Sequence, residues 1–160
     1  MLPTRSILEA YRAFDANDMC NAPVWERLAD HINAEYTALL KYRVLPLIEL
    51  VQVDEPYADL EAMRKDFYRK RLKVSELNCV HPVFSRKTNL RFRILHDIAH
   101  CVTNADFSED GEYNVFLHQS NGLSSELKQA LYTEIVIQAS HKIHYGYFAD
   151  QKLFLAGDIE

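Results

Sequence analysis

Two histidines and a glutamate stand at a spacing that can bind a metal ion. His96 and His100 lie four residues apart, and Glu112 follows after eleven further residues. On a helix, side chains four residues apart lie one above the other, so the two imidazoles can chelate one divalent cation. A loop after His100 can fold back and bring Glu112 over this pair, and Gly111 lets the backbone pack closely there. The spacing predicts a metal site.

Two neighbouring charged residues could take part in its chemistry. Asp97 follows His96 directly and lies ~100° around the helix, so it could bind the metal from the side, orient a ligand, or accept a proton from metal-bound water. Arg93 could keep Asp97 ionised or bind an anionic group of a ligand. The alternative is a plain helix with two histidines, an Arg93–Asp97 salt bridge, and Glu112 as a helix N-terminal charge.

Further polar residues are weaker candidates. A stripe on the last expected helix could line a pocket or form a solvated face, the latter being favoured: Glu134, Gln138, His141 and Tyr145. His118 could face the site from a position after Glu112. A basic run could form a solvated helix face or touch anionic lipid headgroups: Arg64, Lys65, Arg69, Lys70 and Arg71.

Helical periodicity runs through the chain and predicts an all-α bundle in one domain over residues 1–160. Capping residues and apolar spacing place helices from Thr4, from Asn21 to Pro46, from Pro46 to Val53, from Asp54 past Phe67, from Thr88 past Val102, over 111–119, and over 125–148. Residues 74–86 are expected to form a loop. The last helix should bury Tyr132, Ile135, Val136, Ala139, Ile143 and Tyr147.

Composition excludes several functional classes. The 160 residues carry a net charge of −5, which argues against nucleic-acid binding through phosphate contacts. None of the four glycines precedes Gly111, so a P-loop and a dinucleotide fingerprint are excluded. The three cysteines are odd in number and widely spaced, which indicates a reducing compartment. No apolar run has the length of a membrane span, and no signal or transit peptide is evident, so a cytoplasmic location is expected.

The metal-site residues also carry a family resemblance. Arg93-x-x-His96-Asp97-x-x-His100, with Gly111 and Glu112 after the eleven-residue interval, resembles the metal motif of the ubiquinone (coenzyme Q) biosynthesis family known as Coq-four. The resemblance implies an all-helical fold and a zinc ion on His96, Asp97, His100 and Glu112. It also implies a hydrophobic channel for a prenyl tail, a prenylated benzoquinone precursor as substrate, contact with a membrane face, and removal of a ring carboxylate.

These observations lead to one expected function and two alternatives. We expect a metal-dependent lyase or oxidative decarboxylase-like enzyme that uses Asp97 and Arg93 on a hydrophobic aromatic or prenylated acid. Zinc is the expected metal, with iron as the alternative, and a homo-oligomer is compatible. The second reading is an HD-type metal phosphohydrolase, which would add His81 and Asp150 and would not require Glu112. The third is a non-catalytic lipid-binding scaffold.

Overall fold

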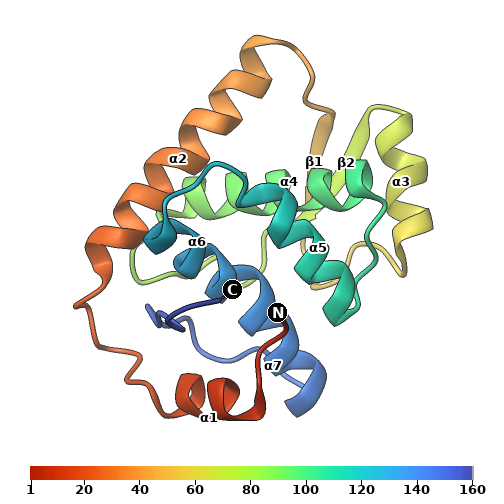
Figure 1. Ribbon diagram of the computed structural model, residues 1–160. Coiled ribbons are helices and arrows are strands. Elements are labelled where there is room, and N and C mark those ends of the chain that lie inside the picture. Colours follow the sequence, from red (N-terminus) through yellow and green to blue (C-terminus); the bar gives the residue numbers. More distant parts are fainter. Residues whose placement is uncertain (160) are drawn as a thin grey trace.

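The computed structural model describes residues 1–159, which form a mostly helical fold with a small sheet (Figure 1). The helices have these bounds: α1, Arg5–Ala13; α2, Ala22–Lys41; α3, Leu60–Tyr68; α4, Arg86–Thr103; α5, Glu109–Gln119; α6, Ser125–Tyr132; η1, a π-helical turn, Thr133–Ile137; and α7, Gln138–Tyr145. Two strands complete the fold: β1, Leu47–Val51, and β2, Arg71–Ser75. The predicted helical character is confirmed, but the fold is not strictly all-α.

The two strands pair in parallel, which corrects the helix predicted from Pro46 to Val53. Leu47 lies opposite Arg71, and α3 forms the connection between the strands. The β1 sequence, Leu-Ile-Glu-Leu-Val, is too short to distinguish a helix from a strand by its periodicity. Leu72 and Val74 of β2 are fully buried, and this burial favours a strand at β2 with which residues 47–51 can pair.

Helix α4 crosses the middle of the fold and packs against α2, α3, α5 and β2 (Figure 1). Its N-cap is Ser85, whose side chain accepts a hydrogen bond from the Thr88 amide, so the predicted start at Thr88 lies one turn too late. Ile94, Leu95 and Cys101 are buried on its inner faces. Because α4 is packed on several sides, its polar residues are held in fixed positions.

The predicted helix over 125–148 is interrupted and ends earlier. A π-helical turn, η1, joins α6 to α7, and Gly146 ends α7 with φ 84°. The extra residue in a π turn rotates the following side chains around the helix axis. Tyr132, Ile135 and Val136 are buried as predicted, whereas Ile143 and Tyr147 are half exposed, at 50% and 56%.

Among residues 1–159, no helix combines the length and the apolar character that a membrane crossing requires.

Candidate metal centre

His96 and His100 point from one face of α4 toward a common position. Their rings are nearly perpendicular, at 87°, and their centroids lie 4.6 Å apart. The two Nε2 atoms are 3.1 Å apart. Phe92 stacks on His96, and Phe107 meets the edge of His100, so aromatic side chains hold both rings in place.

The other nitrogen of each ring makes a hydrogen bond that fixes its orientation. His100 Nδ1 donates to the carbonyl oxygen of Ala105 at 2.8 Å, and His96 Nδ1 donates to Gln119 Oε1 at 3.1 Å. An Nδ1 proton used in this way leaves a lone pair on Nε2 of a neutral ring. Metal-binding histidines are oriented by hydrogen bonds of this kind.

The loop between α4 and α5 brings Glu112 to the histidines. Asn104 ends α4 in the left-handed conformation, with φ 56°, and Ser108 caps α5 by accepting a hydrogen bond from the Gly111 amide. A Cβ atom on Gly111 would lie 2.0 Å from the carbonyl oxygen of Asp106. Only glycine fits this close approach, as the sequence predicted. Because Glu112 follows Gly111 directly, the close packing of the backbone there also places Glu112 at the histidines.

Glu112 closes the cluster with both carboxylate oxygens. Its Oε2 lies 3.1 Å from His96 Nε2, and its Oε1 lies 3.3 Å from His100 Nε2. Because zinc–ligand bonds measure ~2.0–2.1 Å, two ligand atoms on a tetrahedral zinc stand roughly 3.3 Å apart. The observed separations match that spacing, so His96, His100 and Glu112 could bind a metal ion.

The pKa values of His96 and Glu112 are shifted because three electron-rich groups lie close together. Burial lowers the pKa of His96, but the negative charge of the Glu112 carboxylate has a larger opposite effect, so the pKa of His96 rises to about 9. Burial raises the pKa of Glu112, but the charge of His96 and the close contacts with both imidazoles lower it to about 2. A proton on His96 therefore takes the place that a metal ion would fill.

Asp97 lies beside the cluster and is not one of its grouped ligands. The three residues whose donor atoms meet are His96, His100 and Glu112. Burial raises the pKa of Asp97 to about 6, against the opposing positive charge of His96. Within residues 1–159, its carboxyl group makes no hydrogen bond and no ion pair. Asp97 is thus a partly buried acid close to the cluster, and its pKa is raised above the ordinary value of a carboxyl group.

Arg93 binds backbone carbonyl groups. Its guanidinium donates to the carbonyl oxygens of Ser75 at 2.8 Å, Leu77 at 2.7 Å and Asn78 at 3.1 Å. No Arg93–Asp97 ion pair forms within the described chain, although the positive charge still lowers the pKa of Asp97 slightly. The contacts of Arg93 hold the segment after β2 against α4.

His81 and Asp150, which an HD-type phosphohydrolase would add as ligands, do not lie at the cluster. His81 Nδ1 accepts hydrogen bonds from the amides of Val83 and Phe84, while its Nε2 donates to Glu134 Oε1 at 2.8 Å. Asp150 is exposed, and its carbonyl oxygen accepts a hydrogen bond from Tyr11. Both residues lie outside the group formed by His96, His100 and Glu112.

The polar stripe on the last helices is mostly buried, which corrects the favoured solvated face. Gln138 and His141 are 5% and 1% exposed, and the Glu134 side chain is 4% exposed. Glu134 accepts hydrogen bonds from His81 and from Trp25 Nε1, whereas His141 donates to the carbonyl oxygen of Tyr147. The stripe thus fastens distant segments together. His118 is exposed.

Sequence reasoning missed Gln119, which orients His96. It lies two helical turns after Glu112, on the same face of α5, and this spacing could have identified it. The carbonyl of Ala105 has no side-chain signature and could not have been found. Comparison with protein-family models, with curated proteins and with solved structures finds no match for the chain.

Proposed function

We propose that the protein is a metal-dependent enzyme that binds one zinc ion through His96, His100 and Glu112. One observation carries this proposal. Two Nε2 lone pairs and a carboxylate converge within 3.3 Å, while both Nδ1 atoms are already used as donors. Electron-rich atoms gathered this closely need either a proton or a metal ion between them, and a zinc ion fits their spacing. Imidazole and carboxylate together suit zinc, and a redox-active iron is the alternative.

Three protein ligands favour a catalytic site over a structural one. Structural zinc sites use four protein ligands, whereas catalytic sites keep one position open for water or substrate. The side chains of His96 and Glu112 are 17% and 12% exposed, while that of His100 is 1% exposed. A small molecule would therefore approach from the side of His96 and Glu112.

Asp97 is our candidate for proton transfer in this enzyme. Burial raises the pKa of Asp97, which favours its protonated form and suits it to donate a proton beside the cluster. Its carboxyl group has no hydrogen-bond partner within residues 1–159 that would occupy its lone pairs. Arg93 is a positioning residue, because its hydrogen bonds to backbone carbonyl groups hold the chain at the end of β2 and just after it against α4.

The resemblance of the motif to the Coq-four family supports the substrate class. We propose a hydrophobic aromatic or prenylated acid as substrate and loss of its ring carboxylate as the reaction. Zinc in the site would supply a Lewis acid for the carboxylate or an enolate of the substrate. When carbon dioxide leaves, the electron pair of the broken bond stays on the ring carbon, and protonated Asp97 would donate the proton that this carbon takes up.

The decisive experiment measures bound metal by elemental analysis of protein purified without an affinity tag. We expect about one zinc per chain in the unmodified protein. The Glu112→Gln variant should lose the metal, and Asp110→Asn, a change at an exposed acid on the same helix, should retain it. Metal-free unmodified protein under zinc-replete conditions would refute the proposal. Bound metal without turnover of any aromatic acid would leave a scaffold whose metal joins α4 to α5.

A further inference from the structure

The sheet has one free edge beside an apolar cavity. Leu47 donates its amide proton to Lys70, and the carbonyl of Val51 accepts from Glu76. In a parallel ladder, alternate residues of a strand face the same neighbour, so Leu47, Glu49 and Val51 bond to β2. The backbone N–H and C=O groups of Ile48 and Leu50 then point away from β2. No hydrogen bond joins them to another of residues 1–159.

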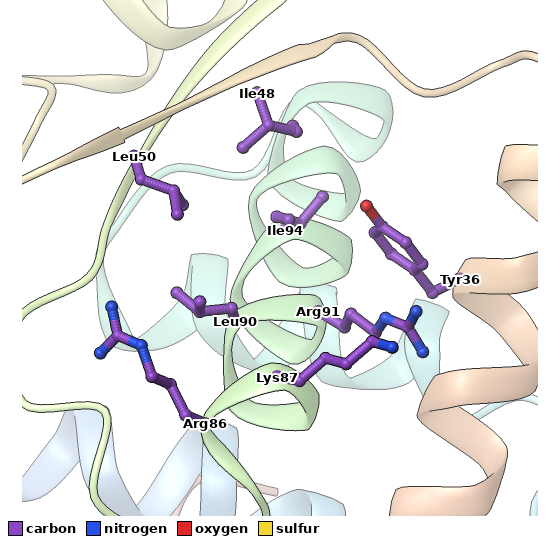
Figure 2. Close-up of a pocket in the computed structure, with 8 residues that line it drawn as sticks. All are labelled: Tyr36, Ile48, Leu50, Arg86, Lys87, Leu90, Arg91 and Ile94. Carbon is purple, nitrogen blue, oxygen red and sulfur yellow. The ribbon is translucent and has the colours of Figure 1, made fainter.

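The cavity lies directly beneath this edge, between β1, α2 and α4 (Figure 2). Its volume is about 590 Å³, within the roughly 300–1,000 Å³ of known ligand sites. The side chains of Ile48 and Leu50 point into it from β1, and Leu90, Ile94 and Tyr36 lie opposite. These apolar side chains offer room for the inner face of one more strand.

This cavity is separate from the metal centre. At ~100° per residue, Lys87, Arg91 and Ile94 lie about 120–180° around α4 from His96 and His100. His96, His100 and Glu112 are absent from the lining of the cavity, so a ligand in the cavity would not touch the metal ligands.

The rim of the cavity is positively charged in a chain whose net charge is −5. Three cations and no carboxylate contribute to the lining, and Figure 2 shows Arg86, Lys87 and Arg91 along one side of it. Arg86 pairs with Glu76 at 2.7 Å, and Arg91 donates to Asn33 at 2.8 Å. Lys87 has no polar partner within residues 1–159, so its charge is available to an anionic ligand.

We infer that this groove binds an extended acidic peptide from a partner protein, which adds to β1 as a third strand. Such a peptide satisfies the free backbone groups of Ile48 and Leu50, places alternate apolar side chains in the cavity, and pairs its carboxylates with the rim. A fatty acid would leave the backbone groups unpaired. A second copy of β1 would bring its own Glu49 to the centre of the new ladder, where like charges repel.

The test uses a synthetic nine-residue peptide with capped ends: two glutamates, an alternating Val-Thr-Val-Thr-Val centre, and two glutamates. We expect saturable binding by isotope-labelled NMR, with slowed hydrogen exchange at the Ile48 and Leu50 amides. Exchange at the Glu49 amide, which already bonds to β2, should change little. This pattern identifies the free edge, because filling the cavity alone would not protect those two amides.

Matched controls separate the two parts of the inference. N-methylation of alternate peptide nitrogens removes the ladder and should weaken binding at least roughly tenfold. Lys87→Glu should weaken it by about tenfold, while Lys65→Glu, an exposed change on α3, should not. No binding at millimolar peptide, or binding insensitive to N-methylation, would overturn the inference. Binding of dodecanoate in place of the peptide, with Ile48 and Leu50 unprotected, would overturn it in favour of a lipid ligand.

Discussion

The Nε2 atoms of His96 and His100 face each other at 3.1 Å, and each belongs to a ring whose Nδ1 already donates a hydrogen bond. Two lone pairs cannot rest at this distance without a proton or a metal ion between them. In the metal-free protein the proton fills this role, because the pKa of His96 is raised against the lowering effect of burial, chiefly by Glu112.

Metal affinity should therefore rise with pH. Zinc must displace the proton on His96, whose pKa is about 9, so the apparent affinity should increase up to about tenfold per pH unit between pH 6 and 9. Competition with a chromophoric chelator at several pH values would measure this slope. An affinity that does not change over the range would contradict the protonated cluster.

The stability of the metal-free protein should show the opposite trend. A raised pKa of His96 stabilises the fold below the ordinary value of 6.5, and this contribution is lost as the pH rises through about 9. The lowered pKa of Glu112 contributes above 4.5 and is lost as the pH falls through about 2. Urea unfolding of the chelated protein and of His96→Gln should differ most near pH 6 and least above pH 9. Equal pH profiles would show that the ion pair has no effect on folding.

Gly111→Ala should damage both the fold and the site. The added methyl group would collide with the Asp106 carbonyl oxygen, so we expect a loss of about 1–3 kcal/mol and much lower metal content. The matched control is Gly122→Ala, where φ is +80° and no atom lies within 4 Å. It should cost about 1 kcal/mol through backbone strain alone and retain the metal. Urea titration and elemental analysis of both variants provide the comparison.

Gln119→Leu should weaken metal binding while the fold persists. Removing the acceptor of the His96 Nδ1 proton frees the ring to rotate, and losses of this kind reduce metal affinity roughly 10–100-fold. His118→Ala, a change at the exposed neighbour, should leave zinc affinity unchanged. Equal affinities in Gln119→Leu and the unmodified protein would mean that Phe92 alone orients the ring.

Glu134→Ala should destabilise the protein without removing its metal. Glu134 accepts hydrogen bonds from Trp25 and His81 in a buried setting, and two donors would lose their acceptor. We expect a loss of about 2–4 kcal/mol in urea unfolding. Glu126→Ala, which breaks only an exposed pair with Arg27, should cost less than about 1 kcal/mol. Similar losses in the two variants would contradict this role.

The convergence of His96, His100 and Glu112 was predictable because its signals are local. The spacing of His96 and His100 on one helix, and the need for a small residue before Glu112, follow from helix geometry and backbone sterics. The role of Asp97 could not be resolved in the same way. Its angle around α4 is set by sequence, but its environment depends on where neighbouring elements pack.

The errors concern long-range contacts. β1 resembles a short apolar helix until its pairing with a strand 24 residues away is known. The stripe that includes Glu134 and Gln138 has the sequence pattern of a polar surface, because its burial comes from segments far along the chain, such as those of Trp25 and Tyr11. The positive charge of Arg93 suggests a carboxylate partner, but Arg93 binds backbone carbonyl groups. Every residue carries such a group, so the sequence does not indicate which ones are bound.

The parallel pairing of β1 and β2 has a consequence for how the chain folds. A parallel pair cannot close through a tight hairpin, so β1 must wait until the crossover through α3 is in place. Closing that crossover costs conformational entropy, and the burial of Leu72 and Val74 is what offsets this cost. Since Arg93 of α4 also donates hydrogen bonds to carbonyl groups at the end of β2 and just after it, the sheet and α4 should assemble in one cooperative step late in folding.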